Sequence, residues 1–476
     1  MKRVRFALSL SLSMLLIATS CDDLFDLKEN PKQFIAPSGY YNTTAQIETV
    51  LSGCMASLYY KWGGYAYNPS LHQHDDHKSG GNLIIPLNHG SAIYAAHFAN
   101  IKDINFALAS IGKLEDGGTS QTVIDELVGQ LKFLRAWNYF QLVRMWGGMP
   151  ILTENNIDEY FKLLPSRASV AETYAFILSD FQEAEAKLPP SWPLFGRPTK
   201  YAAKALMAKA HLTMATYPLN ETSNYAKAAS LAKEVIDSGI FSLMTDITKV
   251  FSKEGEDGPE MIWSFVANDQ YSVTTSYVWS PTYGWGDNSV DQIWVDSVYV
   301  DQPRKYAYLE THNREGVPVK DLGKAVGVRK YLYDMENFDR HISTINMPII
   351  RYADVLLIFA EAENMSKGGP TPEAVTAINS VIHRANGNQP NPEYPLLTTS
   401  MTQQAFDTAV IFERGLELCF EYDRWHDIIR KRILYEVSRE EYQPNFKEES
   451  YLFPIPESDV RLNPNMKQNP GYFTGN

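Results

Sequence analysis

Apolar residues recur at gaps of three and four along much of the chain, and this spacing constrains the fold more than any other feature. Ile124, Leu127, Leu131 and Leu134 form one such stripe. A helix with an apolar stripe packs that stripe against another element, because the stripe would otherwise face water. The sequence therefore predicts a mainly α-helical protein whose helices pack on one another.

The first residues of two further helices are marked by capping signals. Ser169, with Glu172 three positions later, has the spacing of a capping box and predicts a helix that runs to about Leu188. Thr371 before Pro372 places an N-cap residue and a first-turn proline at a second helix start. Both starts are local signals that need no tertiary contact.

Alanines line two neighbouring helical segments, at residues 205–215 and 225–236. Alanine faces let helix axes approach closely, as in the helix pairs of solenoid repeats. The repeat period is degenerate, so self-similarity does not define exact repeats. We expect a scaffold of a few tetratricopeptide-like helix pairs.

A stripe over residues 409–419 predicts one long helix that ends near Arg432. Two acid–base pairs on it have the spacings i,i+3 and i,i+4, with the acid first in each. Such spacing favours ion pairs along a helix face over a catalytic role. The pairs are Glu421 with Arg424, and Asp427 with Lys431.

The first 20 residues have the layout of a secretory signal. A basic start precedes an apolar run over residues 6–18, which is too short to span a bilayer, and small residues precede Cys21. This order resembles a bacterial lipobox, which implies cleavage before Cys21 and a lipid on its thiol; the alternative is an ordinary signal peptide with a chance cysteine. We expect a signal peptide at 1–20, a lipidated tether at 21–40 and a single domain at 41–476.

Charge and cysteine content exclude several classes of protein. With 43 basic and 56 acidic residues the net charge is −13, which argues against a nucleic-acid partner. The acidic residues that follow Cys21 resemble the surface-export signals of Bacteroidota lipoproteins, or form a solvated tether. Three cysteines are too few for a disulfide framework. Cys54 and Cys419 could pair with each other, but two buried thiols are favoured.

Two stretches, residues 59–88 and 264–327, lack helical spacing and are expected to be functional irregular regions. Each holds an aromatic window, with five aromatic residues in 59–67 and four in 277–285. Exposed Trp and Tyr rings can stack on the apolar face of a sugar, while polar groups bond its hydroxyls. Alternatively, the rings pack the irregular regions onto the scaffold, and Tyr59 and Tyr60 are assigned to the core. The candidate glycan contacts are Trp62, Tyr65, Tyr67, Trp279, Tyr283 and Trp285, with Asn82 and Asn288 as polar candidates.

Motifs for metal binding or catalysis are weak. His72, His74 and His77 flank two aspartates and could bind a transition metal, but no paired C-x-x-C or H-E-x-x-H accompanies them. Polar loop residues are therefore favoured, and no metal or cofactor is expected. The sequence has no G-x-S-x-G elbow, P-loop or zinc-protease motif, so an enzyme is not expected. The 56 acidic residues are numerous enough to include the two catalytic carboxyl groups of a glycosidase, so their number does not decide against one.

Five ordered motifs, together with the lipobox, resemble those of the SusD/RagB family of outer-membrane lipoproteins. The sequence RYADVLL followed by AEA, and the sequence ERGLEL followed by Glu421, Arg424 and Asp427, resemble two of the family's helices. The match runs from Cys21 to Tyr472. The five motifs lie at residues 133–150, 351–362, 378–385, 413–427 and 452–472.

The resemblance implies a helical scaffold with four tetratricopeptide-like units and an irregular, aromatic-rich insertion. It implies a lipid-anchored protein on the outer face of the outer membrane that binds glycans and caps a SusC-like TonB-dependent transporter. The family often places ligand contacts in the loop after its first helix and in its central insertion, here 59–88 and 264–327. The alternatives are a tetratricopeptide-type protein-interaction scaffold, against which the aromatic windows argue, and, less favoured, a glycoside hydrolase.

Overall fold

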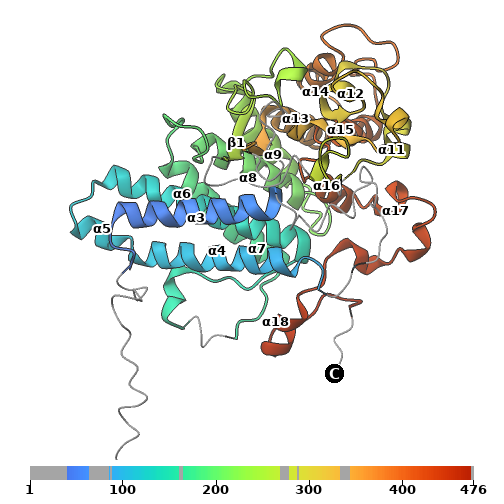
Figure 1. Cartoon of the computed structure of the whole chain (residues 1–476). Coiled ribbons are helices and arrows are strands. Elements are labelled where there is room, and N and C mark those ends of the chain that lie inside the picture. The colour runs from blue at the N-terminus through green and yellow to red at the C-terminus, as the bar shows by residue number, and fades with distance from the viewer. Residues whose placement is uncertain are drawn as a thin grey trace, which may run out of the picture.

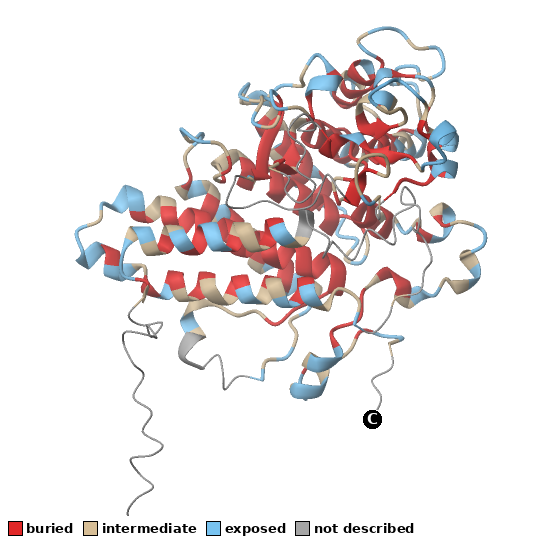
Figure 2. Cartoon of the chain, viewed as in Figure 1, coloured by how far each residue is buried: buried red, intermediate tan, exposed pale blue. Residues whose placement is uncertain are grey.

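Helices make up most of the molecule (Figure 1), as the apolar spacing predicts. Buried residues concentrate in the helices at its centre (Figure 2). The computed structural model describes residues 40–63, 85, 88–159, 164–267, 278–286, 289–332 and 344–472.

The elements fall into a helical scaffold and an insertion between α9 and α13. The scaffold helices are α3 (Thr44–Gly63), α4 (Ser91–Ser110), α5 (Gly112–Asp116), α6 (Gln121–Trp146), α7 (Val170–Lys187), α8 (Lys200–Met214), α9 (Asn224–Asp237), α13 (Tyr352–Lys367), α14 (Pro372–Ala385), α15 (Gln403–Glu417) and α16 (Arg424–Lys431). The insertion holds β1 (Met261–Phe265), α11 (Gln292–Val298), α12 (Pro303–Tyr308), β2 (Leu309–Glu310), β3 (Gly327–Val328) and β4 (Met347–Arg351). The helices α17 (Leu434–Val437) and α18 (Glu457–Leu462) follow α16. Short 3-10 turns are η2 (Glu154–Glu159), η3 (Ile247–Lys249), η4 (Val319–Leu322), η5 (Arg329–Tyr331), η7 (Gln443–Asn445) and η8 (Glu448–Tyr451).

Consecutive scaffold helices pack in pairs, as expected for tetratricopeptide-like units. The pairs are α3 with α4, α6 with α7, α8 with α9, and α13 with α14. Neighbouring pairs are joined by contacts of α4 with α6, α7 with α8, and α9 with α13. Because α13 packs on α9, the chain returns to the scaffold after the insertion and continues the helix stack.

Two antiparallel strands lie where the insertion leaves and rejoins the scaffold. In the β1–β4 pair, Met261 lies opposite Arg351 and Phe265 opposite Met347. The second pair is short and places Glu310 opposite Gly327. The insertion is therefore tied at its base by one strand pair and contains another.

Both capping predictions are confirmed. The Glu172 amide donates to the Ser169 hydroxyl at 3.2 Å, and the Ser169 amide donates to the Glu172 carboxylate at 2.8 Å, which completes a capping box at the start of α7. The Thr371 hydroxyl accepts from the Ala374 amide at 3.1 Å at the start of α14, with Pro372 in the first turn.

The prediction of one long helix up to Arg432 is wrong. The chain leaves the helix after Glu417, and α16 begins at Arg424. In between, Phe420 and Tyr422 have φ of 60° and 68°, values that a right-handed helix does not allow. The backbone carbonyls here bond side chains of the insertion instead of continuing the helix, as described below.

The ion pairs predicted along that helix are also wrong in their partners. Glu421 pairs with Lys330 and Arg351. Asp427 pairs with Arg414 and with Arg430. Both acids make buried pairs with residues of other elements, and Asp427 also pairs with Arg430 within α16.

Candidate functional site

A tight turn over residues 280–286 carries two of the predicted aromatic candidates. The Ser280 carbonyl accepts from the Gly284 amide at 2.9 Å, and the Ser280 hydroxyl accepts from the Tyr283 amide at 3.0 Å. Gly286 has φ +66°, and a Cβ there would lie 2.6 Å from Cα of Pro281. Only glycine allows the turn to close this tightly.

The turn presents Trp285 to solvent, with 52% of its surface exposed. Tyr283 is half-buried, and its hydroxyl accepts from the Arg314 amide at 2.6 Å. The Arg314 guanidinium lies 5.2 Å from the centre of the Tyr283 ring, in cation–π range. The segment after β2 therefore supports one of the two rings of the turn.

A second exposed ring of the insertion lies just before β2. Tyr306 of α12 is 42% exposed, and its hydroxyl donates to Asp301 at 2.7 Å. Its ring centre lies 6.1 Å from that of His312. We call Tyr283, Trp285, Tyr306, His312 and Arg314 the aromatic surface. Tyr306, His312 and Arg314 were not among the predicted contacts, although Tyr306 is an aromatic residue in a stretch without helical spacing.

Trp279 does not belong to this surface, which corrects its assignment as a glycan contact. Its side chain is fully buried and packs 6.1 Å from the Tyr331 ring and 5.3 Å from the Phe420 ring. The alternative that rings of the insertion pack it onto the scaffold is therefore right for Trp279. Of the two tyrosines assigned to the core, Tyr59 is buried but Tyr60 is exposed.

The other candidates lie outside the described residues. Trp62 belongs to α3, but its side chain is not among those described. The remaining positions are Cys21, Tyr65, Tyr67, His72, His74, His77, Asn82 and Asn288.

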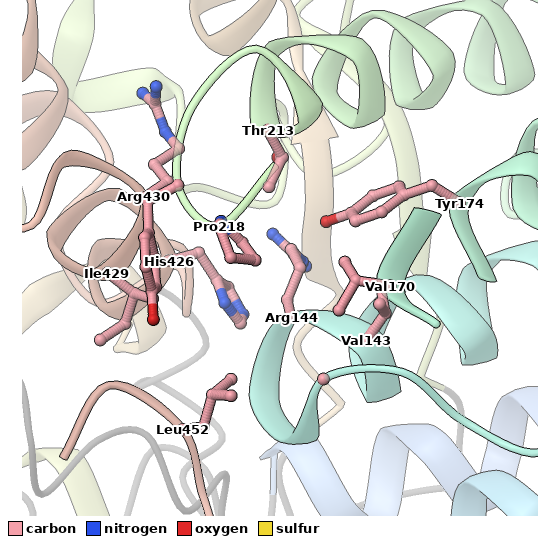
Figure 3. A pocket seen from close by; sticks show the side chains of 12 residues that line it. Val143, Arg144, Val170, Tyr174, Thr213, Pro218, His426, Ile429, Arg430 and Leu452 are labelled. Carbon is pink, nitrogen blue, oxygen red and sulfur yellow. The ribbon is translucent and has the colours of Figure 1, made fainter. Parts of the chain in front are cut away.

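A small, partly open cavity between α6, α7, α8 and α16 is too small for a sugar (Figure 3). Its volume is about 30 Å³, and the side chains of Arg144, Tyr174 and His426 help to line it. A water molecule needs roughly 10–15 Å³ measured this way, so the cavity suits about two waters. We therefore do not assign ligand binding to it.

Comparison with known proteins identifies the family. The model of the SusD family matches residues 252–472. A second model, described as starch-binding and associating with the outer membrane, matches residues 71–212. The chain belongs to the SusD/RagB family.

Relatives of this SusD-family chain match over nearly its whole length. SusD-like protein P2 of Formosa agariphila is 27% identical, over 96% of this chain and 98% of that protein. A SusD homologue from Bacteroides thetaiotaomicron superposes with a TM-score of 0.77 at 21% identity, over 93% of this chain and 100% of the other. A laminarin-binding SusD-like protein superposes with a TM-score of 0.73 at 21% identity, over 90% and 99% of the two chains. At these identities the two solved structures show a shared fold.

The SusD-family motifs build a buried charge network behind the insertion. Arg351 Nη1 lies 2.7 Å from Glu260 and 2.8 Å from Glu417, and its Nε lies 2.8 Å from Glu421. Arg384 bonds the same Glu260 and Glu417. Burial alone would raise the pKa of Glu417, but the surrounding guanidinium groups hold it well below its usual range. These buried ion pairs join the base of the insertion to α14 and α15.

Cys54 and Cys419 are buried thiols that no disulfide joins, which confirms the favoured alternative, and burial raises the pKa of Cys54 to about 12. Within the described ranges, His, Cys, Asp and Glu side chains form no group of three or more suited to a metal ion. None of the helices described has the length and apolarity needed to cross a membrane.

Proposed function

We propose that this SusD-family protein is a cell-surface, glycan-binding lipoprotein that captures oligosaccharides or polysaccharide and delivers them to a TonB-dependent outer-membrane transporter. The observation that carries the proposal is the exposed indole of Trp285, on the same turn as Tyr283, whose ring lies against Arg314. A flat ring on a tight turn offers a stacking surface for the C–H face of a sugar. The laminarin-binding relative and the starch-binding family description support a glycan as the ligand.

The proposed function is binding without hydrolysis. A glycosidase needs two carboxyl groups facing the scissile bond, one of them a proton donor. Near the aromatic surface, the Asp301 carboxylate accepts from the Tyr306 hydroxyl, and Glu310 is buried below the turn with 2% exposure. A buried Glu310 cannot reach a sugar stacked on Trp285. Release of reducing ends from laminarin or soluble starch by the purified protein would overturn this part of the proposal.

Calorimetry on Trp285→Ala and Tyr283→Ala, with laminarin and soluble starch as ligands, tests the site. Loss of a central ring should weaken binding by about 1–3 kcal/mol, as for other binding hot spots. Phe412→Ala is the matched control, because Phe412 is 41% exposed on α15, outside the aromatic surface. Unchanged affinity in both turn variants would place the site elsewhere, and absence of any glycan binding would favour the protein-interaction scaffold.

The anchor and the partner belong to the same proposal. The lipobox at Cys21 supports a lipid anchor, and the paired helices offer an extended surface to a membrane partner. Affinity purification of the full-length protein from gently solubilised outer membranes should recover a barrel protein in near-equal amount. Recovery of this chain alone would count against the transporter.

A further inference from the structure

Glu310 lies directly beneath the turn that carries Tyr283 and Trp285. It ends β2, is 2% exposed, and accepts from the Ser280 hydroxyl at 2.9 Å. Ser280 is itself fully buried, and its oxygen accepts from the Tyr283 amide at 3.0 Å. A line of two hydrogen bonds therefore joins the Glu310 carboxyl to the backbone of a residue of the aromatic surface.

The packing around the Glu310 carboxyl leaves it little freedom. Glu310 faces Gly327 across the β2–β3 pair, and a Cβ on Gly327 would overlap the Glu310 carboxyl oxygen. The same Cβ would lie 2.7 Å from Pro281 and 2.8 Å from the carbonyl oxygen of Trp279. The carboxyl is thus held between strand β3 and the start of the turn.

Glu310 differs from the other buried glutamates near the insertion. Glu413 and Glu417 are buried against arginines, whereas among the described residues no basic group lies within ion-pair distance of Glu310. The groups that face it are the hydroxyls of Ser280 and Thr282 in the turn and, at longer range, the charge of Arg329 after β3. Burial outweighs these groups and raises the pKa of Glu310 to about 7.

We propose that Glu310 is a positioning residue that fixes the turn 280–286 through Ser280 and thereby sets the Tyr283 and Trp285 rings for ligand binding. This inference rests on the proposed function of the aromatic surface. The neutral carboxyl is compatible with the closed turn. An ionised carboxylate without a cation favours a rearrangement that admits water, so affinity for the glycan falls as the pH rises through about 7.

Ligand titrations between pH 5.5 and 8.5, with laminarin or soluble starch, separate positioning from a merely structural role. In the parent protein the Kd should rise several-fold across this range, whereas Glu310→Gln, which stays neutral, should show no such rise. Glu310→Ala and Ser280→Ala should weaken binding roughly tenfold even at pH 5.5. The control is Ser110→Ala, at a buried serine that ends α4; the next helix, α5, lies on the opposite side of the molecule from α11 (Figure 1). A Glu310→Gln variant that keeps the pH dependence of the parent would overturn the proposal.

Hydrogen exchange of the turn tests Glu310 without any ligand. Peptides covering residues 280–286 should exchange several-fold faster in Glu310→Ala and Ser280→Ala than in the parent, and at the parent rate in Glu310→Gln and Ser110→Ala at pH 5.5. Equal exchange in the parent, Glu310→Ala and Ser280→Ala would overturn the positioning role. A parent that binds neither polysaccharide would overturn the proposed function, and exchange would still decide on Glu310.

Discussion

Arg351 is fully buried and bonds the carboxylates of Glu260, Glu417 and Glu421 with one guanidinium group. A buried pair gains little over an apolar replacement of both partners, because desolvation offsets the attraction. Removing one partner is different, since the remaining charges stay buried without compensation. Loss of Arg351 alone should therefore destabilise the junction between the insertion and the scaffold, although Arg384 bonds two of the same acids.

We expect Arg351→Met to lower the free energy of unfolding by about 3–5 kcal/mol, because it leaves buried carboxylates short of a cation. Guanidinium denaturation followed by circular dichroism measures the change. Lys233→Met is the control, because Lys233 pairs with Asp237 on the exposed face of α9 and should cost less than about 0.5 kcal/mol. Similar losses in both variants would contradict this account of the network.

Glu310 makes stability depend on pH in a direction opposite to that of an ion-paired acid. Its pKa is about 7 in the folded chain against an ordinary value of 4.5, so the folded state holds the proton more tightly. The neutral Glu310 carboxyl contributes about 3 kcal/mol to the free energy of unfolding. This contribution is fully present below about pH 4.5 and is lost as the pH rises through about 7. The unfolding free energy of the parent minus that of Glu310→Gln should therefore fall between pH 4.5 and 8. A constant difference would mean that the carboxyl is not held neutral.

The sequence predicted the two aromatic windows but not which of their side chains are buried and which are exposed. Trp279 and Trp285 stand six positions apart in the same Gly- and Pro-containing stretch, yet one is fully buried and the other half exposed. The difference comes from Tyr331 and Phe420, which lie far along the chain and enclose Trp279. Local composition carries no information about such partners.

At the scale of elements, the break between α15 and α16 shows tertiary contacts overriding a helical pattern. Lys330 Nζ donates to the carbonyls of Glu417 and Cys419 at 2.9 Å each. The hydroxyls of Tyr299 and Tyr331 donate to the carbonyls of Leu416 and Phe420. These side chains satisfy the end of the helix, so the chain can turn sharply without leaving buried carbonyls unbonded. The apolar spacing alone could not reveal donors that come from the insertion.

Helix starts were predictable because their signals are local, and a single substitution at the capping residue tests each signal. Ser169→Ala removes the acceptor of the Glu172 amide and should destabilise the protein by about 1 kcal/mol. Thermal or denaturant unfolding measures the loss. Ser223→Ala is the matched control, because Ser223 precedes α9 without a side-chain capping bond and should change stability little. An equal effect at both serines would show that the capping box contributes nothing.

At the scale of the whole molecule, the family motifs predicted the helix-pair scaffold well, because four of the five span scaffold helices and their buried contacts. The irregular insertion was predicted only as a region. Its short strands and turns depend on Gly286, Gly327 and strand partners that are distant in sequence. The spacing of apolar residues does not predict such contacts.

The lipid anchor is a prediction about the intact protein in its cell. Cys21→Ala should abolish incorporation of labelled fatty acid and release the protein from the membrane fraction, because the thiol would be the only attachment point for the lipid. Cys54→Ala is the control, since that thiol is buried in α3 and should leave labelling unchanged. Continued labelling of Cys21→Ala would contradict the anchor.

The strand pair β1–β4 and the arginines behind it separate the two tasks of the insertion. The strand pair and Arg351 tie the insertion at its base, and Lys330 bonds it to the end of α15, whereas Trp285 on the turn 280–286 is half exposed. Substitutions in the turn could therefore change the sugar specificity during evolution without changing the packing of the scaffold. The same separation suggests how to engineer specificity. The turn of one relative could be exchanged for that of another, with Ser280, Gly286 and Glu310 kept and residues 281–285 varied.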